Sequence, residues 1–560
     1  MILLNTFLVY IFFLIIQPVI INNSEASSAF DSLRELTIGP QSISVKLEGY
    51  LDRDRYHEMR YVNQKSGSDR EGDGSGEKPW ATIQHALTQI TDARLSKRYA
   101  VLISEGNYVE STIHLKEYIS LYGGFEGSTW DRDIKRYKTV LNGDGRERVL
   151  TGADFSRIDG FEIREGVVRG RGGGILCDGT SPVITNNVFT QNRTLSPVPW
   201  DPEFLHEVAH DGAAIATYNG ASPVVENNLF FRNSTEIGRG GGIASHNRSS
   251  PRIAYNIFID NVAGTADLMR SSDGGAISAA LYSNPDIRHN LIIGNKVLND
   301  NDGGGIFSEL WSSLLIEGNI IIGNSAADDG GGIFIAGQTH HYVTVDDPVP
   351  SPERFLIQIR DNIMMGNSII GEKESIHGVM RSTNDSRLVF NNNLIAESIG
   401  GIDFRRSDIE ATGNTIFADI VVRESAVPAR FSNNLIFGDL IEESEVISKN
   451  TQVVEKSKFN DENLFMEFFI DDCLFIEAVD VEFHEDRYVT VIRLKDIIIN
   501  PDELIYRILR SDDRWGVVKQ NDEKSITVWG NFEDMRTFIV LPTYTHNESS
   551  IFYDAGIGHR

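Results

Sequence analysis

The middle of the chain repeats one pattern of apolar and polar positions, in which a run of glycines is followed by an isoleucine, a short β-prone stretch and two asparagines. The pattern extends from Ile158 to about Gly438. Short strands between turn-forming residues, repeated at a nearly regular interval, are typical of a solenoid, in which each coil buries its apolar side chains against its neighbours.

Six copies of the glycine motif align the repeats. They end at isoleucines in equivalent positions: Ile175, Ile215, Ile243, Ile277, Ile306 and Ile333. The asparagine pairs, always separated by four residues, are Asn187 and Asn192, Asn228 and Asn233, Asn256 and Asn261, Asn290 and Asn295, Asn319 and Asn324, and Asn362 and Asn367. Six occurrences at one spacing exclude coincidence.

The two residue types have a physical role in such a solenoid. Tight corners need residues that tolerate φ > 0 or close backbone approach, which favours glycine and asparagine. Asparagines stacked about 4.8 Å apart, the distance between neighbouring strands, can form a ladder of amide hydrogen bonds. The motif isoleucines are predicted to fill the interior together with a second apolar set: Ile184, Val225, Ile253, Ile287, Ile316 and Ile359. We therefore predict an all-β fold, a single-stranded parallel β-helix.

A helix is predicted ahead of the coils. After the polar stretch from Gly67 to Lys78, the apolar residues Ile83, Ala86, Leu87 and Ile90 lie at helical offsets, on one face of a short amphipathic helix. An open-ended solenoid needs such an element to cover its first coil. We interpret it as a short N-terminal helical cap.

These patterns divide the chain into five parts. Residues 1–29 begin with an apolar run and end in small residues, as a secretory signal peptide does, although the run is long enough for an uncleaved anchor. We assign 30–60 to a linker, 61–150 to the cap and first coils, and 151–440 to the repeats. In 441–560 the repeat fades into an acidic, β-prone stretch, which we predict to be a C-terminal β-rich module.

The net charge and the number of cysteines limit the kinds of partner that this protein is expected to bind. The 80 acidic and 52 basic side chains give a net charge of -28, which repels nucleic acid and anionic membrane surfaces. The two cysteines, Cys177 and Cys473, are too few for a disulfide framework. We expect a secreted or cell-surface protein that contacts a membrane only through an uncleaved N-terminal segment, if at all.

Two long insertions interrupt the coils. They span 193–210 and 337–354, and each contains two of the histidines His206, His210, His340 and His341. Insertions in solenoids usually mark the functional face. His206 and His210 stand four apart, which suits a metal only on a helix, and Pro197, Pro199 and Pro202 make the start of that loop irregular.

The glycine motif, followed by Phe189 to Asn192, Phe230 to Asn233 and Phe258 to Asn261, resembles the GGAI and FxxN repeats of polymorphic outer-membrane proteins. With Tyr122 to Phe125, the chain also resembles the wider pectate-lyase-like class of bacterial secreted right-handed β-helix proteins. The resemblance covers about residues 60 to 440 and implies a right-handed parallel β-helix. Members include polysaccharide lyases and adhesins, and no lyase motif maps onto this chain residue by residue.

The sharpest candidate site lies four residues before each motif isoleucine. In coil order the side chains are Arg171, Asp211, Arg239, Asp273, Asp302 and Asp329. Neighbouring carboxylates about 4.8 Å apart repel by about 3.5 kcal/mol at an effective dielectric of about 20, so the three consecutive aspartates need relief. Splayed side chains in water, a raised pKa, a nearby arginine or a cation would each provide it.

Three interpretations of Asp273, Asp302 and Asp329 stay open. They could be metal ligands for calcium, which prefers several carboxylate and carbonyl oxygens. They could be catalytic, because a carboxylate pair about 5 to 5.5 Å apart cleaves a glycosidic bond with retention. A lyase would instead use the ion to neutralise a uronate while a lysine or arginine takes the proton. Alternatively, aspartate before two glycines is simply good turn chemistry.

A second row, three residues after each motif isoleucine, should point outward from the same strands. It comprises Asp178, Tyr218, His246, Ala280, Glu309 and Ala336. Tyr218, His246 and Glu309, with Arg171 and Arg239 of the first row, are our candidate substrate-binding residues, because rings and charges on a flat face suit a sugar chain. The alternative is the solvated side of a sheet. Our leading hypothesis is binding of an extracellular polysaccharide or cell-surface glycan along the coils, and the competing one is a polysaccharide lyase or glycoside hydrolase.

Overall fold

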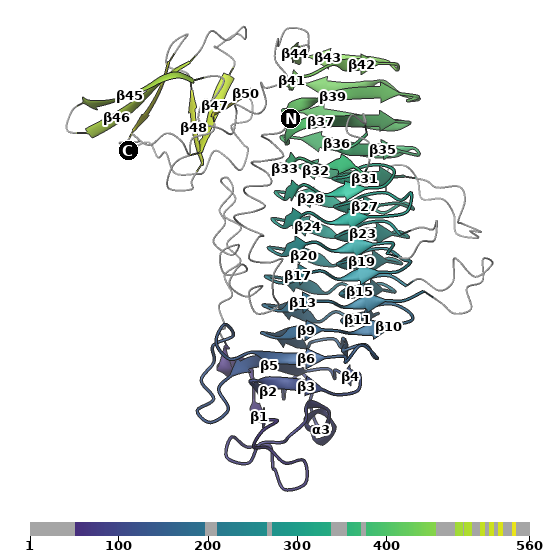
Figure 1. Cartoon of the computed structure of the whole chain (residues 1–560), viewed down its shortest axis with the longest axis vertical. Coiled ribbons are helices and arrows are strands. Elements are labelled where there is room, and N and C mark those ends of the chain that lie inside the picture. Colours follow the sequence, from purple (N-terminus) through teal and green to yellow (C-terminus); the bar gives the residue numbers. More distant parts are fainter. Residues whose placement is uncertain are drawn as a thin grey trace.

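The structure, a computed structural model, describes residues 51–196, 210–265, 272–337, 356–370 and 377–454, and six strands between Ile476 and Tyr544. The predicted signal peptide, most of the predicted linker, Cys473, and the histidines at 206, 340 and 341 lie outside the described residues. The coils stack into one long right-handed parallel β-helix, which confirms the predicted fold class (Figure 1).

Each coil contributes strands to parallel sheets that run the length of the solenoid. The 14-stranded sheet consists of β1 (Glu58–Val62), β2 (Tyr99–Ser104), β5 (Ile119–Phe125), β8 (Arg157–Asp159), β12 (Val183–Thr185), β16 (Val224–Glu226), β20 (Arg252–Ala254), β24 (Asp286–Arg288), β28 (Leu315–Glu317), β32 (Ile357–Arg360), β36 (Ser386–Asn391), β38 (Ser407–Thr412), β40 (Ala429–Ser432) and β43 (Val446–Lys449). The 7-stranded sheet consists of β10 (Val167–Val168), β14 (Arg193–Thr194), β18 (Ser234–Thr235), β22 (Val262–Ala263), β26 (Lys296–Val297), β30 (Ser325–Ala326) and β34 (Ser368–Ile369).

The 23-stranded sheet contains two parallel rows of strands that merge in the long strands β37 (Leu394–Arg405) and β39 (Thr415–Arg423). One row, here the β11–β35 row, follows the glycine motif: β11 (Ile175–Asp178), β15 (Ile215–Tyr218), β19 (Ile243–His246), β23 (Ile277–Ala280), β27 (Ile306–Ser308), β31 (Ile333–Ala336) and β35 (Met380–Thr383). The other follows the first asparagine: β6 (Thr139–Asn142), β9 (Glu162–Arg164), β13 (Val188–Thr190), β17 (Leu229–Phe231), β21 (Ile257–Ile259), β25 (Leu291–Ile293), β29 (Ile320–Ile322) and β33 (Ile363–Met365). The remaining members are β3 (Gly106–Val109), β4 (Ile113–His114), β7 (Leu150–Thr151), β41 (Leu435–Phe437), β42 (Leu440–Glu442) and β44 (Gln452–Val454).

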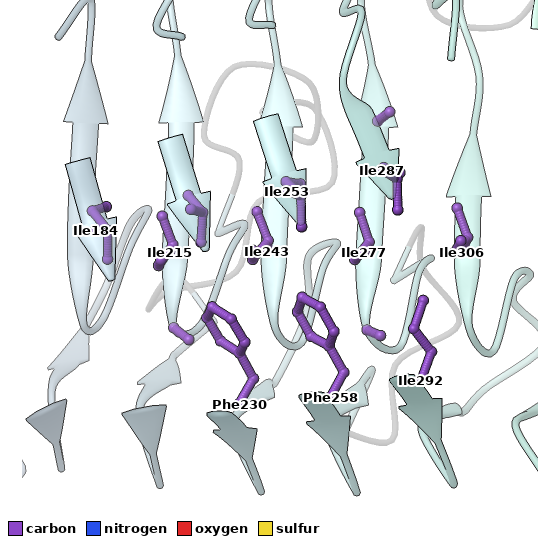
Figure 2. Close-up of a cluster of buried hydrophobic side chains, with 14 of the residues drawn as sticks. Ile184, Ile215, Phe230, Ile243, Ile253, Phe258, Ile277, Ile287, Ile292 and Ile306 are labelled. Atoms are coloured by element: carbon purple, nitrogen blue, oxygen red, sulfur yellow. The ribbon is translucent and has the colours of Figure 1, made fainter. Parts of the chain in front are cut away.

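The interior is filled as the repeat predicts. Ile215 pairs with Ile243 and Ile243 with Ile277 in the β11–β35 row, so the motif isoleucines stack on one another inside the coils (Figure 2). Phe230 and Phe258 stack beside them with ring centroids 4.5 Å apart. Stacking of like residues in successive coils lets one apolar core run continuously along the solenoid.

The asparagine ladder is also present. The backbone N–H and the side-chain amide of Asn187 both donate to Oδ1 of Asn228, at 3.0 and 3.1 Å. The first-asparagine row continues beyond the predicted copies, through Asn393 and Asn414 to Asn434. All these side chains are buried, so the ladder satisfies corner backbone groups that water does not reach.

The conformation of these corners differs from the prediction in one respect. The residue with positive φ is the one before each ladder asparagine, such as Asn186 at 58° and Gln191 at 56°. Even Arg232 and Tyr255 adopt this backbone, at 53° and 55°. The ladder asparagine is selected for its hydrogen bonds and not for its tolerance of the left-handed region, because its amide must point inward along the stack.

At the N-terminal end, the predicted helix is confirmed as α3 (Ile83–Gln89), which lies beside the first coils (Figure 1). The hydroxyl of Thr82 accepts a hydrogen bond from the His85 N–H and caps the helix, and Ile83, Ala86 and Leu87 are buried. A single turn of 3-10 helix, η1 (Arg53–Arg55), precedes β1.

At the other end, the coils continue past Leu440 to β44. The strands farther along form two antiparallel sheets, which distinguishes them from the coils: β45 (Ile476–His484), β46 (Arg487–Leu494) and β49 (Ser525–Trp529), and β47 (Leu504–Leu509), β48 (Trp515–Lys519) and β50 (Val540–Tyr544).

Candidate functional site

The row that begins with Arg171 lies at the corner that leads into the β11–β35 row. The N–H of the first glycine of each motif donates to the carbonyl of the row residue in the next coil, for example Gly172 to Asp211 and Gly303 to Asp329, both at 3.0 Å. Gly330 donates in the same way to His377, at 3.0 Å. The stacked row therefore has a seventh member, which the sequence reasoning missed.

Local backbone chemistry keeps this corner tight. The first glycine of each motif has positive φ, for example 75° at Gly274. The second glycine lies against the next coil, where a Cβ on Gly275 would come within 2.3 Å of the Gly304 carbonyl oxygen. Glycine stands at the first position in all six copies, and the second position departs from glycine only at the small Ala213, so the row residue just before them is held in a similar place in successive coils.

The second row occupies the same strands, with Asp178 paired to Tyr218 and His246 to Ala280. These positions point outward, yet His246 and Glu309 are only 2 and 3% exposed. The outer side of the β11–β35 row is therefore not simply a solvated face. Its charged side chains reach across to the first row and pair with it.

One such group is centred on Arg239. Its Nε lies 3.2 Å from Oδ2 of Asp273, and its Nη1 lies 2.5 Å from Oε1 of Glu309. The row residue Arg239 thus joins a carboxylate of the next coil to a carboxylate of the second row. Asp273, Glu309 and Arg239 were all predicted site residues, and the structure brings the three together.

A second group is centred on His246. Its Nδ1 lies 3.0 Å from Oδ2 of Asp211, and its Nε2 lies 3.1 Å from the hydroxyl of Ser278. Burial alone raises the pKa of the Asp211 carboxyl, but the charge and hydrogen bond of His246, together with Arg239, outweigh it and hold that pKa at about 2. Asp211 is therefore ionised at neutral pH.

A third group relieves the last aspartate of the row. Arg381 forms an ion pair with Asp329, and its Nε lies 3.3 Å from Oδ2 of Asp403. His377 Nε2 lies 3.4 Å from the other Asp329 oxygen. Arg381 and Asp403 were not predicted. Each follows the residue that stacks on the motif isoleucines by one position, whereas the second row was defined three positions after it; both offsets place a side chain on the outward side.

Asp302 lies between these groups. Its N–H donates to Asp273 Oδ1 at 3.2 Å, and its Oδ1 accepts from the Asp329 N–H at 3.0 Å. Among the residues that the structure describes, no cation lies within ion-pair distance of its carboxyl. Burial, followed by the charges of Asp273 and Asp329, raises its pKa well above the ordinary range, so Asp302 is protonated where most carboxylates are ionised.

Asp273 shows the same effect more weakly. Burial raises its pKa to about 6, with a contribution from Glu309 and against the opposing charge of Arg239. The repulsion expected among the three aspartates is thus relieved in two ways. Arginines neutralise Asp273 and Asp329, and the raised pKa of Asp302 favours its uncharged form.

The metal grouping differs from the expected one. Oxygen atoms of Asp302, Asp328 and Asp329 lie within 4.8 Å of one another, whereas the Asp273 carboxylate is turned toward Arg239. Asp328 was missed because it precedes the row by one position. Of the four histidines in the two insertions, His210 lies among the described residues, and it is buried and does not belong to this trio.

Aromatic side chains flank the charged groups. The guanidinium carbon of Arg171 lies 3.6 Å from the centroid of the Tyr218 ring, which is partly exposed. At the next corner Tyr282 and Trp311 stack with centroids 5.3 Å apart, and Arg248 lies 5.3 Å from the Tyr282 centroid. Rings and guanidinium groups thus border the charged face in successive coils.

The raised pKa of Asp302 predicts a pH dependence of stability. Between pH 4 and the higher folded-state pKa, the folded protein holds a proton that the unfolded chain has lost, so stability falls as the pH rises. We expect Asp302→Asn to raise the free energy of unfolding at pH 7 by about 1 kcal/mol or more, the scale of a single pKa unit, and to have little effect near pH 4. Denaturant unfolding at both pH values measures this, with the exposed Asp131→Asn as control. A loss of stability at pH 7 would contradict the assignment.

A comparison with protein families agrees with the observed fold. Residues 149–298 match a family model described as a right-handed β-helix region. A search of curated proteins found no match. A tailspike protein double mutant of E. coli bacteriophage HK620 aligns over 82% of this chain and 88% of its own, at 9% sequence identity and a TM-score of 0.21. No helix among the described residues is long and apolar enough to cross a membrane. The family match and the stacked strands together establish a right-handed parallel β-helix.

Proposed function

We propose that this protein is a secreted or cell-surface β-helix that binds glycan along the outer side of the β11–β35 row. The observation that carries the proposal is the buried link from Asp273 through Arg239 to Glu309 on an outward-facing strand surface. Removing charged groups from water is costly, and retaining three of them in one fixed arrangement is typical of a binding or catalytic site.

Glycan is the ligand class that this chemistry suits. Sugar hydroxyls take hydrogen bonds from carboxylates and guanidinium groups, and the apolar faces of sugar rings pack on aromatic side chains. The Arg171–Tyr218 pair offers both, in a partly exposed position. His246 and Glu309 were expected to touch the ligand. Because both are buried, we assign them instead to holding Asp211 and Arg239 in place.

Binding to a panel of acidic and neutral polysaccharides, measured by affinity electrophoresis and calorimetry, tests the proposal. We expect Arg171→Gln to weaken binding about tenfold, because a hydrogen bond from a charged group contributes about 1.5 to 3 kcal/mol. The matched control is Arg430→Gln, an exposed arginine on β40. Unchanged affinity in the Arg171 variant, or no binding to any polysaccharide, would refute the coil-face site.

A second candidate function is cleavage of the bound glycan, which the raised pKa of Asp302 favours. A carboxylic acid with a raised pKa can protonate the leaving oxygen of a glycosidic bond, and an ionised carboxylate nearby can act as the partner. Hydrolysis fits better than lyase chemistry, because Arg239 and Arg381 are each held between two carboxylates and neither is placed to act as a base.

Product formation on uronate polymers and neutral polysaccharides, with and without calcium, tests the catalytic version. Asp302→Ala should abolish product if Asp302 is the acid, and Asp131→Ala should not. Calcium stays a prediction: Asp302, Asp328 and Asp329 would supply the oxygens, in competition with Arg381 for Asp329. No product on any polymer would remove the enzymatic version and leave binding intact.

A further inference from the structure

A cavity of about 530 Å³ lies near the N-terminal end of the coils, beside the 14-stranded sheet. Its wall comes from the corners that lead into β2, β5, β8 and β12, and it includes Tyr118, Phe155 and Ser181. None of the residues of the charged groups on the β11–β35 row lines it. It is therefore a separate feature of the surface.

The cavity is lined by one residue from each of four successive corners, and the large ones among these residues differ from those at the same position in the following coils. Register places Arg98, Tyr118, Phe155 and Ser181 in equivalent positions of successive coils, because Tyr99 pairs with Ile119, Ser120 with Arg157, and Arg157 with Val183. Later coils have Ser222 and Ser250 at this position. Small polar residues occupy this position in the four coils after Ser181, up to Ser313, whereas Tyr118 and Phe155 place two large rings there.

The two rings form a platform with one uncovered face. Tyr118 and Phe155 are stacked with centroids 4.9 Å apart and planes only 2° from parallel. Tyr118 covers one face of the Phe155 ring, while the next residue in the row, Ser181, is too small to cover the other. Phe155 is 63% exposed, and its φ of 57° is unusual for a bulky side chain. Neither burial nor backbone preference explains a phenylalanine at this position.

The charge around the platform is positive, in contrast to the net charge of -28 of the chain. Arg55, Arg98 and Arg157 line the cavity, against the single carboxylate of Asp154. Arg157 is paired with Asp159, and Arg55 with Asp52. Within the described parts of the chain, the Arg98 guanidinium has no hydrogen bond or ion pair. It is a cation at the cavity wall that remains available to a ligand.

We propose that this cavity binds a carboxylated sugar residue of an acidic saccharide, with the sugar ring stacked on the open face of Phe155 and its carboxylate on Arg98. The apolar face of a pyranose ring matches an exposed aromatic ring, and a guanidinium forms planar, paired hydrogen bonds with a carboxylate. This site goes beyond the proposed coil-face site, because it uses different residues in different coils.

The test uses the full chain and calorimetric titration with a hexamer of a uronic acid and, separately, a neutral maltohexaose. We expect Phe155→Ala to weaken binding of the uronate hexamer about tenfold and Phe155→Trp to retain it. Leu95→Ala is the matched control, since Leu95 is also 63% exposed and lies outside the cavity wall. Arg98→Gln should weaken the uronate hexamer more than the neutral one, and Arg430→Gln should affect neither.

To distinguish binding at the cavity from binding at the coil-face site, the same ligands are titrated into the Arg171→Gln variant. Loss of affinity in the Phe155 variant that persists in the Arg171→Gln background supports the second site, whatever the outcome for the coil face. Unchanged uronate binding in Phe155→Ala, or equal effects of Arg98→Gln on the two hexamers, would overturn the proposal. Circular dichroism of each variant verifies that the fold is retained.

Discussion

Replacing Asn261 by alanine is expected to lower the free energy of unfolding by about 4 kcal/mol. The side-chain amide of Asn261 donates to the Phe230 carbonyl and to Oδ1 of Asn295, both at 2.9 Å. Its own Oδ1 accepts two hydrogen bonds from Asn233, at 3.1 and 2.9 Å. The substitution leaves these partners buried and unsatisfied, and each such group costs about 1 to 3 kcal/mol.

Equilibrium unfolding in urea measures the change, and Asn107→Ala is the control. Asn107 lies on β3 with an exposed side chain, so its removal should change stability by less than about 0.5 kcal/mol. A loss of less than about 1 kcal/mol in the Asn261 variant would show that the ladder is not the main support of these corners. A local effect, with one coil opening before the rest, would appear as a lower denaturant slope.

The ladder also shows how far the amino-acid pattern predicts the fold. Asn261 and its equivalents each follow the first asparagine of their coil by five positions, and this constant spacing within the coil allowed their stacking to be predicted. The positive φ at Asp260, one residue earlier, could not. The same position holds glutamine, arginine and glycine in other coils, so residue type alone does not mark it.

The candidate site was predictable to a similar extent. Register placed Arg239 beside Asp273, since the two occupy one row of the repeat. The ion pair of Arg239 with Glu309 connects a residue of the first row to a residue of the second row. It depends on the direction in which each side chain points, and an alignment of the repeats gives no information on that direction. His377 escaped notice because it precedes Gly378 and Val379, a weakened form of the motif, and follows an inserted segment.

The second large effect is expected from Arg239→Met. Arg239 is 15% exposed and neutralises two carboxylates that are themselves nearly buried. Methionine retains much of the apolar stem but leaves Asp273 and Glu309 without their cation. Breaking a buried ion pair from one side costs about 3 to 5 kcal/mol, and we expect a loss of stability of that size at pH 7. The loss should shrink toward pH 4, because burial already raises the pKa of Asp273 to about 6 and protonation of that carboxyl removes one of the two uncompensated charges.

Two further variants separate charge from packing. Arg252→Met removes an arginine that is 52% exposed and lies 3.0 Å from Glu226, and it should cost less than about 1 kcal/mol. The triple variant Arg239→Met, Asp273→Asn, Glu309→Gln should recover most of the stability lost by Arg239→Met, because no uncompensated charge remains. If the triple variant regains stability but loses glycan affinity, the three charges serve binding at the expense of stability. If the triple variant regains neither stability nor glycan affinity, the role of Arg239 lies in its packing against neighbouring side chains such as Phe307, 5.6 Å from its guanidinium carbon. The charge argument for the coil-face site then fails.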